Sequence, residues 1–276
     1  MSSKSSKGRK RSSEEDETER LALVRANQRA YYDHAARPPL AEVRDDDEIG
    51  WFCSGSRSFF NSVGLLRATP ARADALIEEA IAHFATAGAR RFAWRVGPED
   101  RPADLPDRLL SRGFRRIDVG PMMTLDLRFL DEGAADGPLV VHRVADTRSA
   151  EDWASVVLPS FGLSAAEAER HARWLQVLGF EGPSRSFVGY REGEAVSSAQ
   201  SFLHEGVAGL YWVATTPAER RKGFGRQITA AALRDAAHLG ASVAVLHANE
   251  PASGVYERLG FRGCGSVVRY LWSFDG

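Results

Sequence analysis

The residues best suited to chemistry lie in one basic stretch that contains glycine, RRKGFGRQIT, at residues 220–229. An apolar run, VAGLYWVAT (residues 207–215), precedes it, and an alanine-rich segment that ends at Gly240 follows it. This order predicts a strand, a loop and a helix. Gly223 and Gly225 leave backbone N–H groups uncovered at the helix start, where the helix dipole favours an anion. Phosphate or pyrophosphate is the expected ligand, and four cations surround the turn: Arg220, Arg221, Lys222 and Arg226.

Two common phosphate-binding motifs fit this stretch poorly. A P-loop requires Gly-Lys-Ser/Thr after a longer loop bounded by glycines, but Phe224 follows Gly223. A dinucleotide-binding fingerprint requires a third small residue three positions after its second glycine, and Ile228 stands there. The turn therefore needs another interpretation.

The turn resembles the Arg/Gln-x-x-Gly-x-Gly/Ala motif of the GCN5-related N-acetyltransferases, the GNAT family, through Arg220, Gly223 and Gly225. A second stretch resembles the segment after the fifth strand of that family, Asn-x-x-Ala-x-x-x-Tyr-x-x-x-Gly-Phe. Its defined positions hold Asn249, Ala252, Tyr256, Gly260 and Phe261. Two motifs in the right order make the resemblance specific, and it is strong over residues 138–276 and weak over residues 19–130.

The resemblance implies an α+β fold and acetyl-CoA as the co-substrate, with no metal. The coenzyme's pantetheine arm is expected along the fourth strand, on main-chain groups of Val213, Ala214 and Thr215. Asn249 is expected either to bind this arm or to cap the helix after it. The pyrophosphate is expected on the backbone N–H groups of the turn, at Arg221, Lys222, Gly223, Phe224, Gly225 and Arg226.

The reaction that the resemblance implies is direct attack of a primary amine on the thioester carbonyl. A backbone N–H near Val213 is expected to stabilise the oxyanion. Tyr256 is expected to protonate the leaving thiolate, although a tyrosine that only packs the last helix fits the same position. The general base stays open because the run VAGLYWVAT contains no carboxylate, and the nearby candidates are His204, Glu205 and His247.

Composition limits the class of protein. The chain has 276 residues, of which 43% are hydrophobic and 26% charged, with a formal net charge of -1. These values are typical of a soluble globular protein, and we expect a cytoplasmic one without a nucleic-acid or membrane partner. Cys53 and Cys264 lie far apart and have no metal-binding motif around them, so neither a disulfide framework nor a zinc site is predicted.

The two halves of the chain look like copies of one unit. LLSRGFRR at residues 109–116 aligns with YERLGFRG at residues 256–263, and the helix, glycine and strand before each also correspond. The first copy has PARADA at residues 70–75 where the second has its glycine turn, and it has Leu109 at the position of Tyr256. It is therefore expected to be degenerate, to bind no coenzyme and to shape the substrate cleft.

The predicted organisation is an α+β pair of tandem GNAT domains, each a mixed, mostly antiparallel sheet flanked by helices. Residues 1–18 are serine-rich and charged and are predicted to be a disordered tail. A degenerate GNAT-like domain is expected at residues 19–130, beginning with a helix at Glu19, then a linker at residues 131–137 and a catalytic GNAT domain at residues 138–276.

The predicted function is acetyl transfer from acetyl-CoA to a primary amine, of a small molecule or a peptide, by a monomer or homodimer. One alternative is a regulatory protein that binds acyl-CoA without turnover, which the missing strand carboxylate favours. Another is a nucleotide-binding protein, which would prefer ATP or NAD to the coenzyme.

Overall fold

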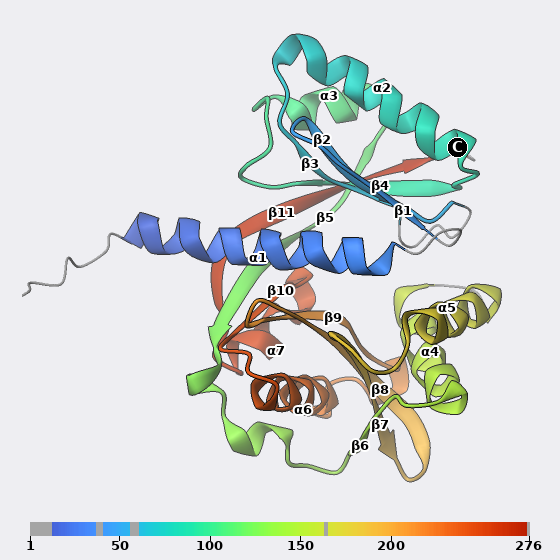
Figure 1. Cartoon of the computed structure of the whole chain (residues 1–276), viewed down its shortest axis with the longest axis vertical. Helices are drawn as coiled ribbons and strands as arrows, with labels where there is room; N and C mark the ends of the chain where they lie inside the picture. The colour runs from blue at the N-terminus through green and yellow to red at the C-terminus, as the bar shows by residue number, and fades with distance from the viewer. Residues whose placement is uncertain (1–12, 37–40, 56–60, 163–164, 275–276) are drawn as a thin grey trace, which may run out of the picture.

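A computed structural model gives the structure, and it describes residues 13–36, 41–55, 61–162 and 165–274 (Figure 1). Most of residues 1–18, the predicted tail, lie outside the described part. Within it the strands are β1 (Glu42–Asp45), β2 (Ile49–Cys53), β3 (Ser62–Leu66), β4 (Arg91–Val96), β5 (Arg115–Asp126), β6 (Val140–Arg143), β7 (Ser184–Arg191), β8 (Glu194–His204), β9 (Val207–Thr215), β10 (Val243–His247) and β11 (Arg262–Ser273). The α-helices are α1 (Ser13–Ala35), α2 (Pro70–Thr86), α3 (Leu105–Ser111), α4 (Thr147–Phe161), α5 (Ala165–Leu178), α6 (Phe224–His238) and α7 (Ser253–Glu257).

The described strands form one mixed sheet in the order β1-β2-β3-β4-β11-β5-β10-β9-β8-β7-β6. Each half of the chain contributes an antiparallel hairpin, β2–β3 or β8–β9, whose second strand pairs in parallel with the strand that follows a long helix, β4 or β10. This equal pairing agrees with the two like halves predicted from the repeat, and the mixed sheet flanked by helices confirms the predicted α+β fold.

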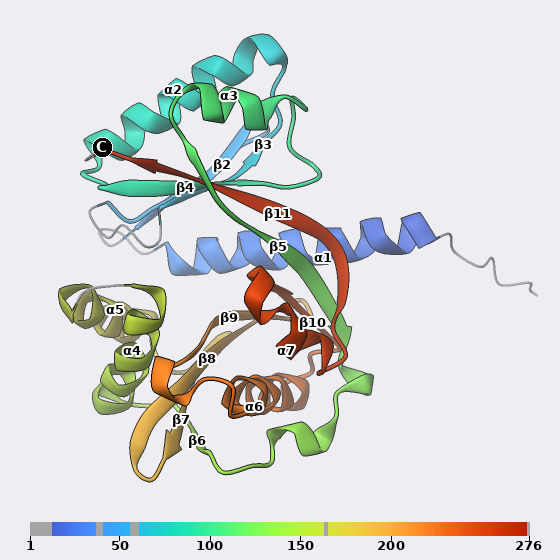
Figure 2. The ribbon, with the colours of Figure 1, turned by 180° about the vertical axis from the view of Figure 1, so that it is seen from behind.

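The last strands of the two halves are exchanged. β5 starts in the first half, but its end, Met122–Asp126, pairs with β10 of the second half. β11 starts in the second half, but its end, Val268–Ser273, pairs with β4 of the first half. β5 and β11 also pair with each other, from Arg262 opposite Thr124 to Leu271 opposite Arg115, and both run along the length of the molecule in Figure 2. Neither half therefore completes its own sheet.

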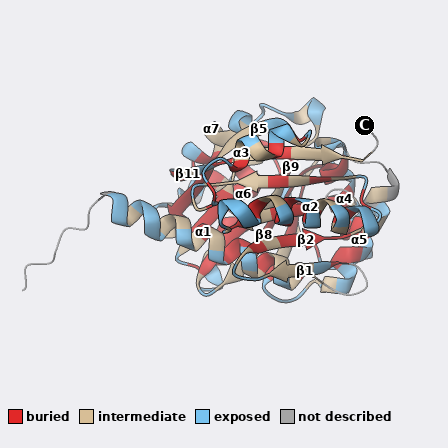
Figure 3. Cartoon of the chain, turned by 90° about the horizontal axis from the view of Figure 1, so that it is seen from above, coloured by how far each residue is buried: buried red, intermediate tan, exposed pale blue. Residues whose placement is uncertain are grey.

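Helices cover both halves and enclose separate cores. α2 and α3 cover the first-half sheet, where Phe84, Phe92 and Trp94 are fully buried. α6 packs on one face of the second-half sheet through Ile228 and Leu233, whereas α4 and α5 pack on the other face. Red buried segments follow the strands in the view from above in Figure 3, with the exposed faces of the helices outside them. None of the described helices is both long enough and apolar enough to pass through a membrane.

Helix α1 lies between the two halves and fastens them together (Figure 1). Asn27 donates from Nδ2 to the carbonyls of Phe202 at 3.2 Å and Val207 at 3.0 Å, in the hairpin of the second half. Arg25 donates to the carbonyl of Gly64 in β3 of the first half, at 3.1 Å. The helix thus binds the second half although it precedes the first in sequence.

Several element boundaries differ from the predictions. α1 begins at Ser13 and not at Glu19, because Glu14, Glu15 and Asp16 fill its first turn, where the helix dipole favours acidic side chains. The short edge strand β1 was not predicted. The predicted linker contains a short 3-10 helix, Glu132–Ala135, which packs against α6.

Substitution of Gly120 tests the strand exchange. A Cβ on Gly120 of β5 would overlap the backbone carbonyl of Ala248, just beyond β10, which neither strand can move away from. We expect Gly120→Ala to lower the free energy of unfolding by about 1–3 kcal/mol, the usual cost of overpacking, measured by urea denaturation. Gly64→Ala is the control because no atom lies within 4 Å of its Cβ position. Equal stability of the two variants would contradict the close β5–β10 contact.

Candidate functional site

The parallel strands β9 and β10 separate after four paired positions. Their pairing ends at Leu210 and Leu246. Beyond that point the chain after β10 stays with β5, since Ala248 donates its N–H to the carbonyl of Pro121 at 3.0 Å. β9 stays with β8 up to Thr215. Within the described part of the chain, the main chain of β9 from Tyr211 onward therefore has no strand neighbour on its β10 side.

A β-bulge lies at the start of this open segment. Ala199 of β8 is opposite two residues of β9, Trp212 and Val213, because the register shifts between the Ser198–Ala214 and Gln200–Tyr211 pairs. Trp212 has a φ of +55°, a left-handed conformation that costs a non-glycine residue about 1–2 kcal/mol. Bulges redirect side chains and main-chain groups next to functional sites.

Several contacts hold the bulge in this conformation. The Trp212 indole donates to the hydroxyl of Tyr31 in α1 at 2.7 Å, and Ser198 donates its hydroxyl to the carbonyl of Trp212 at 3.1 Å. The ring of Trp212 packs edge-on against His171 of α5, with 4.9 Å between ring centroids. The ring of Tyr31 in turn stacks on the ring of Tyr211, with 3.8 Å between ring centroids. The strained residue is thus held by elements of both halves.

A cavity of about 270 Å³ opens where the strands separate. Val213 of the bulge and Tyr256 of α7 line it from the second half, together with the segment Leu246–Asn249. Tyr31 and Tyr32 line it from α1, and Arg95 lines it from β4. Both halves of the chain therefore build this cavity.

The glycine turn leads from β9 into α6. Gly223 precedes the helix with a φ of +88°, a conformation that favours glycine, and no side chain caps the helix start. The first N–H groups of α6, at Phe224, Gly225 and Arg226, consequently have no side-chain acceptor at the cap. A Cβ on Gly225 would come no closer than 3.7 Å, to Thr215 Oγ1. The residues of the turn do not line the cavity. Ala214 and Thr215 lie in sequence between Val213, which lines the cavity, and the turn.

The charges around the turn are partly balanced. Lys222 pairs with Glu219 at 2.9 Å, and Arg226 pairs with Asp131 at 2.7 Å. Hydrogen bonds from Lys222 and Arg191 lower the pKa of the Glu219 carboxyl. Arg220 donates from Nε to the carbonyl of Thr215 at 3.1 Å. The cations therefore position the turn as well as giving it positive charge.

Tyr256 lies in the wall of the cavity and is buried. Burial raises the pKa of its phenol to about 12, so the hydroxyl keeps its proton at neutral pH. The ring also packs edge-on against Phe261, with 5.9 Å between centroids. Tyr256 can thus both pack the last helix and donate a proton into the cavity.

The other predicted residues have different positions. Asn249 caps the short 3-10 helix Glu250–Ala252 by accepting from the Ala252 N–H at 3.1 Å, although it also lines the cavity. His204 and Glu205 lie at the β8–β9 turn and do not line the cavity, whereas His247 does. Burial, followed by nearby Arg95, Arg25 and Arg269, lowers the pKa of His247 well below its usual value, so its imidazole is neutral.

Three charged residues of the cavity were not predicted, namely Arg95, Asp118 and Arg269. They lie on β4, β5 and β11 and face each other only because the last strands are exchanged. Arg269 donates from Nε to Asp118 Oδ1 at 2.6 Å. The sequence shows each of them only as a charged residue within a predicted strand, which does not reveal its partner.

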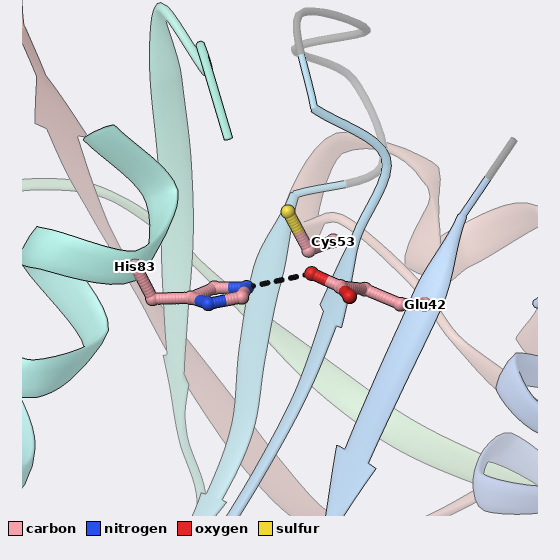
Figure 4. A group of neighbouring side chains, drawn as sticks. All are labelled: Glu42, Cys53 and His83. Atoms are coloured by element: carbon pink, nitrogen blue, oxygen red, sulfur yellow. Dashed lines mark ion pairs between the residues drawn. The ribbon is translucent and has the colours of Figure 1, made fainter. Parts of the chain in front are cut away.

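A second cluster, Glu42, Cys53 and His83, lies at the edge of the first-half sheet (Figure 4). Its ligand atoms lie within 4.8 Å of one another, and all three residue types can bind zinc. However, His83 Nε2 already lies 3.0 Å from Glu42 Oε1, and burial raises the pKa of the Cys53 thiol, which disfavours the thiolate that a metal needs. Cys53 and Cys264 are both buried and free. We interpret the cluster as a contact between α2 and the strand edge.

These features define an α+β protein of two like halves with a cavity where they meet. The acetyltransferase (GNAT) family model matches residues 150–261, so this part of the chain is a GNAT domain. The match includes the bulge, the glycine turn and Tyr256. No curated protein matches the chain.

Solved structures show the same fold over almost the whole chain. A GCN5-related N-acetyltransferase from Kribbella flavida aligns with a TM-score of 0.66 and 17% identity, over 94% of this chain and 96% of that one. A GCN5-related N-acetyltransferase-like protein from Streptococcus suis aligns with a TM-score of 0.61 and 14% identity, over 93% of this chain and 98% of that one. A tandem GNAT protein from the clavulanic acid biosynthesis pathway aligns with a TM-score of 0.59 and 13% identity, over 95% of both chains. At such identities the likeness establishes the fold.

His171, beneath the bulge, is expected to make stability depend on pH. Burial lowers its pKa to about 3, below the ordinary 6.5 of an unfolded chain. As the pH falls from 6.5 toward 3, the unfolded chain takes up a proton that folded His171 refuses, and stability falls by about 1.4 kcal/mol per pH unit. Urea denaturation of His171→Gln should show a shallower loss between pH 6 and pH 4 than the parent chain. Parallel slopes for the two proteins would contradict this effect.

Proposed function

We propose that the second half of the chain transfers an acetyl group from acetyl-CoA to a primary amine. The observation that carries the proposal is the open edge of β9, which begins at the cavity and leads along the chain to the uncapped start of α6. An extended pantetheine arm would pair with the main chain of Val213, Ala214 and Thr215 as an added strand does. Its pyrophosphate would accept hydrogen bonds from backbone N–H groups of residues 221–226, where helix dipole and cations favour an anion.

The bulge supports the chemical step. The amine nitrogen would attack the thioester carbonyl in the cavity and form a tetrahedral intermediate. The N–H of Val213, which the bulge takes out of register with β8, would donate to the oxyanion. Because both reactants lie in one small cavity, the entropic part of the barrier falls.

Two protons must move in this reaction. The ammonium of the acceptor must lose a proton before attack, and the neutral imidazole of His247, which lines the cavity, is the candidate to accept it. When the intermediate collapses, the C–S bond breaks and the thiolate takes the proton of Tyr256. The phenol of Tyr256 holds its proton at neutral pH, so it enters this step as an O–H donor.

The first half is proposed to bind no coenzyme. Its helix α2 begins at Pro70 after Thr69, without a glycine turn, and Asp74 in its first turns pairs with Arg108 and Arg112 at 2.9 Å each. Asp74 thus engages two arginines that would otherwise attract a phosphate. We thus keep the domains proposed from sequence, a degenerate copy at residues 19–130 and a catalytic copy at 138–276 joined by residues 131–137, with the last strands exchanged. A cytoplasmic location and a monomer or homodimer complete the proposal.

A carboxylate in the turn should abolish coenzyme binding. Gly225→Glu places a negative charge beside the N–H groups proposed for the pyrophosphate, and we expect the Kd for acetyl-CoA to rise by about 100-fold or more, as for other lost charge-assisted contacts. Gly263→Glu is the matched control because its Cβ position is open and β11 does not reach the turn there. Calorimetric titration measures both, and an equal effect of the two changes would refute the assigned phosphate site.

Loss of the Tyr256 hydroxyl should slow the reaction and leave coenzyme binding intact. General acids contribute about 10²–10⁴-fold, so Tyr256→Phe should lower kcat by a factor in that range. Tyr270→Phe is the control, since Tyr270 is buried in the first-half core. The assay follows thiol release from acetyl-CoA in the presence of an amine. A chain that binds acetyl-CoA but releases no thiol with any amine would instead be an acyl-CoA-binding regulator.

A further inference from the structure

The cavity contains one positive charge that no described side chain balances. β4 buries Phe92 and Trp94 beneath α2, so strand alternation turns Arg95 to the opposite face, where it lines the cavity. Arg269 is directly opposite Arg95, and Asp118 is directly opposite Arg269. Two arginines and one aspartate leave this row with one excess positive charge.

Asp118 is already engaged with Arg269 through two contacts, Nε to Oδ1 at 2.6 Å and a second guanidinium nitrogen to Oδ2. Among the described residues Arg95 makes no ion pair, and its Nε is buried without a hydrogen-bond partner. Arg95 is half-buried. Like charges at directly opposite strand positions repel, and an unpaired charge is unfavourable where protein partly excludes water. Arg95 is therefore held in a state that an anion would stabilise.

We propose that the acceptor of the acetyl group is a small amine that also carries a carboxylate, and that Arg95 binds this carboxylate. The proposal rests on the acetyltransferase function proposed above. The planar guanidinium matches a carboxylate through two parallel N–H bonds. The pyrophosphate of the coenzyme does not supply this anion, because the turn assigned to it lies outside the cavity.

The size and charge of the cavity agree with an acceptor of amino-acid size. Its volume of about 270 Å³ is below the roughly 300–1,000 Å³ of typical ligand pockets, and the thioester end of the coenzyme would fill part of it. Arg95 is also among the charges that keep His247 a poor proton acceptor. A carboxylate on Arg95 would offset that charge and make the imidazole a better acceptor for the proton of the bound ammonium.

Acceptor preference of the unaltered chain tests the proposal directly. L-Amino acids are compared with their carboxamides and decarboxylated amines, with thiol release from acetyl-CoA as the readout. We expect kcat/KM to be at least about 100-fold higher for the free carboxylates, since a site built for a polar group rejects analogues that lack it. Equal rates for carboxamides would overturn the proposal, and preference for phosphoethanolamine over every amino acid would replace the carboxylate by a phosphate.

A matched pair of variants assigns the effect to Arg95. Arg95→Gln should raise KM for the amino acid about 10- to 100-fold and remove the preference over the carboxamide, with the affinity for acetyl-CoA unchanged. Arg116→Gln, exposed on β5, is the control and should change neither value. An unaltered KM in Arg95→Gln would overturn the assignment.

Calorimetry with the amino acids alone separates this proposal from the function on which it rests. Binding that requires Arg95, in a chain that neither binds nor uses acetyl-CoA, would support the anion site and reject the transferase. Acetylation of amines with and without a carboxylate at similar rates would support the transferase and reject the anion site.

Discussion

The pairing of β5 with β11 is the constraint on which the rest of the structure depends. These strands cross between the halves, so that each completes the sheet of the other. β11 covers the edge of β4 and β5 covers the edge of β10, edges that sheets rarely leave exposed. The crossing also draws the two halves onto opposite sides of α1, and the space that remains beside α1 is the cavity. The fold and the candidate site thus have one cause.

The strain at Trp212 is a second consequence of this arrangement. A left-handed tryptophan persists only where its surroundings overdetermine it. The hydroxyl of Tyr31 in α1 and the ring of His171 in α5 together fix its indole. Since α1 contacts both halves, the first half contributes through α1 to the surroundings that hold the bulge of the second half.

Local patterns in the sequence predicted most of the elements and the order of strand, turn and helix at residues 207–238. The repeat also predicted two like halves, and the structure confirms the common pairing pattern. The exchange was not predictable, because FRRIDVG and FRGCGSVVRYLW have the same strand pattern whichever sheet they join. For the same reason Arg95, Asp118 and Arg269 looked like unrelated charges. Which side chains share a cavity depends on how strands that are distant in sequence pair, and not on the secondary-structure propensity of each strand.

The retention of a first half without a glycine turn has a physical explanation in the charged row. The second half by itself contains the bulge, the turn and the tyrosine. It also contains Arg269 on β11, but the two charged residues opposite Arg269 come from the first half. β4 and β5 place Arg95 and Asp118 on its two sides. Asp118 neutralises one arginine and leaves the other to a ligand, which neither half could achieve alone. In the proposed function, the first half would thus contribute acceptor recognition and the second half coenzyme recognition.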